Sequence, residues 1–149
     1  MERFLKLYQN YVYDVVSCHD VKQKDPEKKK PYHLENSYHM MFIGMAASVE
    51  GMYELTSNLE AGDGRSDVML KSLQPDLRPH IIIEFEQGDD VKKLKQKGLD
   101  QISEKKYYKP LKGNVLCVGI AHNMKRCELV HEEIIVDEDG EMKRVITNV

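Results

Sequence analysis

Apolar side chains recur at spacings of three and four in the first third of the chain, which is the period of an amphipathic helix. Residues 1–16 follow this pattern, and residues 34–49 present a broader apolar face that indicates a second helix. The intervening stretch 22–31 is rich in lysine and contains two prolines. That composition predicts an exposed loop, with phosphate binding by its lysines as the alternative.

After residue 51 the pattern changes to the alternation of β-strands. Residues 52–60 and 65–70 read as two strands of a hairpin, joined by the turn sequence AGDG at 61–64. A polar loop containing two prolines follows, and residues 80–86, HIIIEFE, then form the clearest strand pattern of the chain.

The remaining chain predicts a lysine-crowded helix and at least two more strands. The helix spans 88–108, and the run VLCVGIA at 115–121 suits a strand that is buried on both faces. A further strand is expected at 126–136, before a turn at 137–140 and a short final strand or tail.

This order of elements predicts an α/β fold with a central mixed sheet flanked by helices. We expect a single domain over residues 1–149, a length common for one domain. Residues 34–136 would form its core, and residues 1–33 an N-terminal helix followed by the lysine-rich loop.

Composition narrows the classes of partner and compartment. The formal net charge is −3, so binding to nucleic acid would need a local basic patch. The three cysteines form no CxxC pair, which argues against a structural zinc site or a disulfide framework and favours a reducing, cytoplasmic environment. The longest apolar stretch, 40–49, is too short for a membrane span of about 20 residues.

Two glutamates interrupt the most apolar strand. Side chains alternate along a strand, so Ile82, Glu84 and Glu86 share one face. Neighbouring carboxylates in a low-dielectric interior repel each other unless something compensates their charge. A divalent cation, a basic side chain or emergence of the strand end into water would each do so.

Two further acidic residues could join these glutamates. Asp67, in the preceding strand, could face Glu84 across the sheet, and Mg²⁺ often takes only one or two protein carboxylates. The alternative for Asp67 is a hydrogen bond to nearby backbone. Glu35 and His39 are four residues apart on one helical face, either approaching a metal or forming a surface pair.

Several segments together resemble a known family, over residues 35–128. They read ENSYHMMFIGM, GDGRSDVML, IIIEFE, GLDQISEKKYY and VLCVGIAH. This combination resembles the C-terminal nuclease-like domain of bacterial AAA-ATPase-like proteins, a member of the PD-(D/E)XK nuclease superfamily. The resemblance implies a restriction-endonuclease-like core.

The resemblance also implies roles for individual residues. Asp67 and Glu84 would be metal ligands, together with the peptide carbonyl of Phe85, and Glu35 would be the accessory acid. Gln101 matches a glutamine placed near the site. The implied cofactor is Mg²⁺ or Mn²⁺. The family's turn is matched by Gly62, Gly64 and Arg65, and Tyr107 or Tyr108 would flank the nucleic acid.

One position departs from the family pattern. Glu86 stands where the E-x-K motif has lysine, so Lys105 or another lysine of the following helix would have to supply the charge. Some superfamily restriction enzymes carry E-x-E and still cut, through a base or a second metal. We therefore expect a metal-dependent DNA nuclease, with a non-cutting module for nucleic acid or protein as the alternative.

The resemblance extends to partners. DNA is the expected partner, and cutting both strands of a duplex would favour a homodimer. The chain contains no GxxxxGK[ST] phosphate loop, so an ATPase partner would be a separate chain or segment.

Overall fold

The computed structural model describes residues 2–14, 34–124 and 126–146 of the chain. The lysine-rich loop expected at 22–31 lies outside the described residues. The helical elements are α1 (Glu2–Asp14), α2 (Leu34–Ala46), the 3₁₀ turn η1 (Ala47–Val49) and α3 (Val91–Glu104). The strands are β1 (Tyr53–Ala61), β2 (Gly64–Ser72), β3 (His80–Gln87), β4 (Gly113–Asn123), β5 (Arg126–Val136) and β6 (Met142–Ile146).

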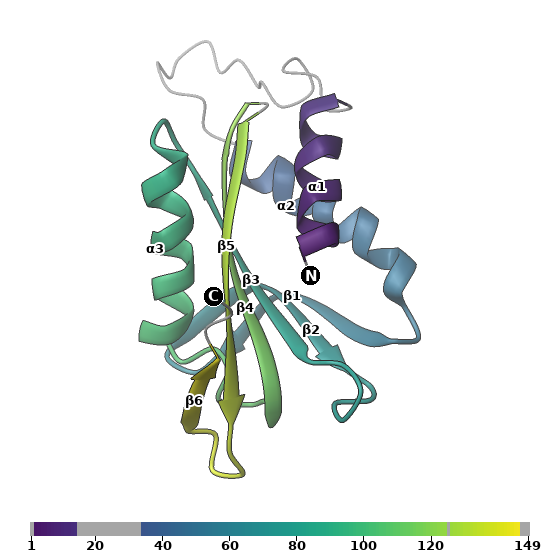
Figure 1. The fold of residues 1–149 in the computed structure, drawn as a ribbon, viewed down its shortest axis with the longest axis vertical. Coiled ribbons are helices and arrows are strands. Elements are labelled where there is room, and N and C mark those ends of the chain that lie inside the picture. The colour runs from purple at the N-terminus through teal and green to yellow at the C-terminus, as the bar shows by residue number, and fades with distance from the viewer. Residues whose placement is uncertain (1, 15–33, 125, 147–149) are drawn as a thin grey trace.

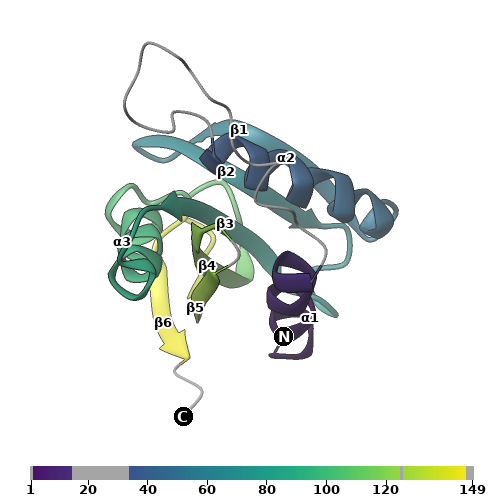
Figure 2. The same cartoon turned by 90° about the horizontal axis from the view of Figure 1, so that it is seen from above.

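The strands form one six-stranded sheet in the order of the sequence, β1-β2-β3-β4-β5-β6. Neighbouring strands are antiparallel except β3 and β4, which are parallel and therefore need a crossover. Helix α3 provides that crossover on one face of the sheet, while α1 and α2 cover the other face (Figures 1 and 2). The predicted α/β fold with a central mixed sheet flanked by helices is confirmed.

Alternation along β3 and β4 supplies both layers of the core. On the side of α1 and α2, Ile83 and Phe85 pack with Tyr8, Tyr38 and Phe42. On the side of α3, the buried cluster comprises Ala61, Met69, Ile82, Leu99, Ile102, Tyr107, Tyr108, Leu111, Val115, Cys117, Ile134 and Val136. Strand β4 contributes to both layers, so the prediction that it is buried on both faces is confirmed.

Helix α3 is shorter than the predicted 88–108. The side chain of Asp90 caps its start by accepting a hydrogen bond from the N–H of Lys93. The helix ends at Glu104, and Lys106 adopts a positive φ of 50°, a conformation that cannot continue a right-handed helix. The chain then turns Tyr107 and Tyr108 into the core, where both rings are buried.

The predicted turn between β1 and β2 packs against the end of α3. Gly62 has a φ of 56°, and a Cβ atom there would lie 2.2 Å from the carbonyl oxygen of Lys105. The N–H of Asp63 donates a hydrogen bond to the same oxygen, at 2.7 Å. Glycine at this position therefore permits the contact that places β2, and with it Asp67, beside α3.

Within the described residues, no helix is long and apolar enough to cross a bilayer.

Candidate active site

The main-chain pairing of β2 with β3 stops partway along the strands, and carboxylates take its place. Val68 opposite Ile83 is the last backbone pair at that end of the ladder. Beyond it, the N–H of Asp67 donates to Oε1 of Glu84 at 2.8 Å. In return, the N–H of Phe85 donates to Oδ2 of Asp67 at 2.9 Å. The two strands are thus joined through acidic side chains, which brings Asp67 and Glu84 together.

Glu84 is buried, with 3% of its surface exposed, and it is held from the side of α3. The amide of Gln101 donates to Oε2 of Glu84 at 2.8 Å and to the hydroxyl of Tyr107 at 3.2 Å. Gly98 of α3 lies over this part of β3, where an added Cβ atom would be at an ordinary contact distance of 3.5 Å from the Cβ of Glu84. The sequence expectation that Gln101 lies near the acidic residues agrees with this geometry.

Glu86 lies on the same face of β3 as Glu84, as alternation predicts. Its carboxylate pairs with the ammonium group of Lys97 on α3, with 2.8 Å between Nζ and Oε1. The Lys97 side chain is 62% exposed, whereas that of Glu86 is only 13% exposed. A lysine of the helix after β3 therefore does lie at the site, and it is Lys97 rather than Lys105.

His39 of α2 is a neighbour of the site that the residue pattern only partly indicated. It is buried, its Nε2 lies 3.0 Å from Oγ of Ser57, and its ring stacks on Phe85 at a centroid distance of 5.6 Å. The available signal was its spacing of four from Glu35. The backbone of Glu35 lies in the first turn of α2, but its side chain lies outside the described residues.

Burial raises the pKa of the Asp67 carboxyl above its ordinary value. The hydrogen bond from the Phe85 N–H and the charge of His39 act in the opposite direction, while the nearby Glu86 carboxylate raises the pKa further. The charged form of Asp67 is therefore disfavoured in the folded protein without a compensating cation. A carboxylate in this environment gains from the binding of a positive ion.

The donor atoms at this site are all oxygens, the ligands that Mg²⁺ and Mn²⁺ prefer. The N–H and C=O of one residue in a strand point to the same neighbour, so the Phe85 carbonyl also faces the side of Asp67. Among the described residues, no group of three His, Cys, Asp or Glu side chains could hold a metal. Asp67 and Glu84 fit a hard divalent ion that keeps several waters, which needs only one or two protein carboxylates.

Replacing Asp67 with asparagine is expected to stabilise the metal-free protein by about 1 kcal/mol, because it removes a disfavoured charge while an amide oxygen can still accept from Phe85. The raised pKa sets the sign: the penalty is present above the folded pKa and disappears as the pH falls through it. Urea unfolding in EDTA at neutral pH measures the difference. Asp63→Asn, in the exposed turn of the same hairpin, is the control. If Asp67→Asn instead destabilises the protein, the Asp67 carboxylate stabilises the fold by joining β2 to β3.

The geometry agrees with a comparison of the whole sequence against protein families. A family model described as the PD-(D/E)XK nuclease superfamily matches residues 33–132, about two thirds of the chain. The matched range contains Asp67, Glu84, Glu86 and Gln101, and it excludes α1 and β6. No curated protein matches the chain.

Proposed function

The chain belongs to the PD-(D/E)XK nuclease superfamily, and we propose that it is a metal-dependent nuclease that hydrolyses phosphodiester bonds of DNA. One observation carries the proposal, namely the reciprocal hydrogen bonds that place Asp67 beside Glu84 where the β2–β3 ladder ends. A structural role alone does not require two carboxylates there, because ordinary main-chain pairing would join the strands without burying charge.

In this proposal Asp67 and Glu84 hold Mg²⁺ or Mn²⁺, aided by the Phe85 carbonyl and by Glu35 as accessory acid. The ion supplies Lewis-acid chemistry, which polarises a phosphate and lowers the pKa of a water. Gln101 orients Glu84 by donating to Oε2, which leaves the second oxygen directed at the Asp67 N–H. For Glu86, the family resemblance implies one of two roles: the base that takes a proton from the attacking water, or a ligand of a second ion.

The second candidate is a nuclease-like module that binds but does not cut. The observation that favours it is the ion pair of Glu86 with Lys97, because it puts a carboxylate where the family motif has a lysine. Such a module would bind nucleic acid, or dock on a protein partner such as an ATPase.

Cleavage of a labelled DNA panel with Mg²⁺ or Mn²⁺, against EDTA, separates the two candidates. Wild-type protein is expected to cut only with metal, and Asp67→Ala to lose about 10²-fold or more of the rate, because several kcal/mol of charge stabilisation depend on the ion. Asp63→Ala is the matched control from the same hairpin and is expected to cut normally.

The outcome with Glu86→Lys completes this test. Cutting by Glu86→Lys but not by the wild type would mark a site disabled at one residue and favour the binding module. If neither protein cuts, the nuclease proposal fails. Equal cutting by wild type and Asp67→Ala would indicate a contaminating enzyme.

The finer properties of the proposed nuclease come from the sequence and its family resemblance. We propose DNA as the substrate, a cytoplasmic location, and a homodimer as the form that cuts both strands. A parallel panel of labelled RNA tests the first of these, and light scattering with and without duplex DNA tests the last.

A further inference from the structure

A groove runs along α3, and two of its lining residues contact the acidic residues of β3. It has a volume of about 300 Å³, and it is lined by Lys93, Gln96, Lys97, Asp100, Gln101 and Glu104. Gln101 also donates to the buried Glu84, so its side chain connects the groove to the carboxylates. Lys97 lies four residues before Gln101, one turn along the same face of the helix. The groove therefore holds a cation, Lys97, beside the residue that contacts the buried Glu84.

A phosphodiester that enters this site meets an unfavourable field. Asp67, Glu84 and Glu86 are all acidic, and the phosphate is itself an anion, so like charges repel unless a cation lies between them. A bound divalent ion removes part of this repulsion, but Glu86 adds a negative charge where the family motif has a positive one. A basic side chain within reach of both Glu86 and the substrate would restore the balance.

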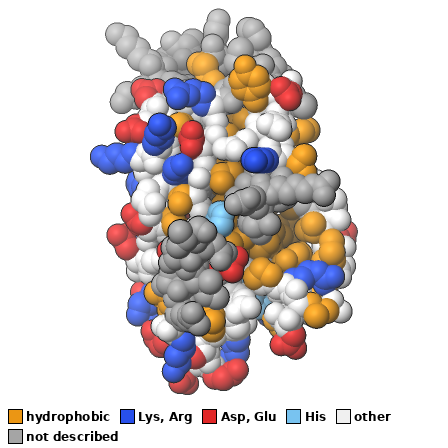
Figure 3. Space-filling view, viewed as in Figure 1, with side chains coloured by type: hydrophobic (Ala, Val, Ile, Leu, Met, Phe, Trp, Pro, Cys, Tyr) orange, Lys and Arg blue, Asp and Glu red, His pale blue; other side chains and the backbone are white. Residues whose placement is uncertain are grey.

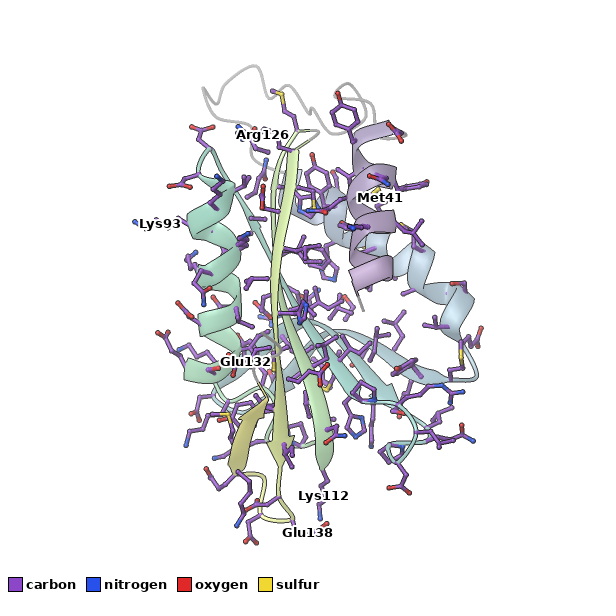
Figure 4. All side chains as sticks on the ribbon, viewed as in Figure 1. Met41, Lys93, Lys112, Arg126, Glu132 and Glu138 are labelled. Carbon is purple, nitrogen blue, oxygen red and sulfur yellow. The ribbon has the colours of Figure 1, made fainter. Side chains whose placement is uncertain are left out.

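The lysines of α3 differ in their suitability for this role. Basic side chains, with acidic ones among them, gather over the upper part of α3 (Figure 3). Lys95 is 25% exposed and is paired with Glu128 of β5, at 3.0 Å. Lys93 points outward from the helix, away from the sheet (Figure 4). Lys97 reaches back to Glu86 at 2.8 Å while most of its side chain stays in solvent.

We propose that Lys97 is the phosphate-binding cation of this site and that Glu86 positions it. The inference rests on the proposed nuclease function and deepens it, because the charge missing from β3 is supplied by α3. The lysine stem is flexible and its ammonium group has three donors, so it can contact a substrate oxygen while Glu86 keeps it at the site. Glu86 then acts through Lys97, rather than as a base or a metal ligand.

Two glutamine variants test the inference. Lys97→Gln removes the paired charge, and Lys93→Gln removes an equal charge from the same groove, four residues away from the Glu86 contact. Glutamine and lysine have similar helix propensities, so both proteins are expected to fold. With Mg²⁺ and labelled DNA, Lys97→Gln is expected to lower kcat by about 10²-fold, the typical loss of one transition-state donor. Lys93→Gln is expected to change KM and not kcat.

A binding measurement in EDTA supplies a readout that does not depend on metal or catalysis. Log affinity for duplex DNA is measured against log salt concentration, and one lost phosphate contact reduces the slope by about 1. Lys97→Gln is expected to show this reduction. An unchanged slope together with an unchanged kcat would overturn the assignment of Lys97.

Glu86→Gln distinguishes positioning from base catalysis, because glutamine cannot take a proton while its amide oxygen can still accept from the Lys97 ammonium group. If Glu86 positions the cation, Glu86→Gln is expected to keep kcat within about 10-fold of the wild type, whereas loss of a general base costs about 10²-fold or more. A loss of that size would return Glu86 to the role of base or ligand. If the wild type cuts and Lys97→Gln cuts equally well, only the Lys97 inference fails. If the wild type neither cuts nor binds, the proposed function fails with it.

Discussion

Replacing Gly119 with alanine is expected to lower the free energy of unfolding by about 3 kcal/mol or more, the upper range for an overpacked core. Gly119 lies in β4, where it faces the backbone of α3. A Cβ atom at this position would lie 2.1 Å from the carbonyl oxygen of Lys95 and 2.7 Å from the amide nitrogen of Leu99. These are main-chain atoms of a helix, so no side-chain rotation can relieve the clash, and α3 as a whole would have to move.

Displacement of α3 would also damage the candidate site, because this helix carries Gln101 and Lys97. Urea unfolding followed by circular dichroism measures the stability change. Gly98→Ala is the matched control on the facing helix. Its new Cβ would lie at an ordinary 3.4 Å from the Glu84 carbonyl oxygen, and alanine favours a helix over glycine by about 1 kcal/mol. A Gly119→Ala protein as stable as the wild type would contradict the close contact between β4 and α3.

Lowering the pH from 7 towards 4 is expected to destabilise the protein strongly through His122. This residue is 1% exposed, and its ring stacks on Tyr38 at a centroid distance of 3.9 Å. Its Nε2 lies 2.9 Å from the hydroxyl of Tyr8. Burial lowers the pKa of His122 to about 3, against an ordinary value of 6.5. The aromatic cluster therefore holds a neutral imidazole, and protonation favours the unfolded chain.

The sign follows from the direction of the shift. A histidine with a lowered folded pKa contributes stability that is complete above its unfolded pKa and is lost as the pH falls below it. The expected loss is about 1.4 kcal/mol per pH unit, or roughly 5 kcal/mol in total if the shift persists down to pH 3. Burial also lowers the pKa of His80, whose Nδ1 accepts from the Ser72 N–H, so its effect has the same sign.

Unfolding free energies measured from pH 7.5 to pH 4 test this expectation. His122→Asn has no titrating group at this position, so its stability is expected to depend much less on pH in this window. His131→Asn, at a partly exposed position of β5, is the control and should keep the acid dependence of the wild type. Equal slopes for His122→Asn and the wild type would mean that other groups cause the acid sensitivity. Protonation of Asp67 acts in the opposite direction and offsets a small part of the loss.

Local sequence patterns were sufficient for most elements of the fold. Alternation placed Ile83 and Phe85 on one face of β3 and Ile82 with Glu84 on the other. The two core clusters and the contact of Gln101 with Glu84 confirm this. The strand expected at 126–136 has those same bounds in β5. The predicted end of α3 was wrong because the turn at Lys106 depends on burying the tyrosines that follow it.

The acidic residues of the candidate site could be predicted from the sequence, whereas the residues that surround them were harder to predict. Asp67 and Glu84 were indicated because charged residues within apolar strands are costly and stand out from their surroundings. Gln101 came from the family resemblance rather than from any local pattern. His39 could be paired with Glu35 by spacing, but its contact with Ser57 joins α2 to β1 and could not be read from either segment alone.

The amino-acid sequence by itself determined the order of helices and strands, the burial of β4 and the identity of the acidic residues, because these depend on periodicity within single segments. Only the tertiary structure decided which lysine meets Glu86, since α3 contains several lysines of equal local character. The same holds for the carboxylate bridge between β2 and β3, which depends on the register of two strands and on the packing of α3 above them. Contacts between segments that are distant in the chain follow from how whole layers pack. That packing brings the charged side chains of β2, β3 and α3 together at one place.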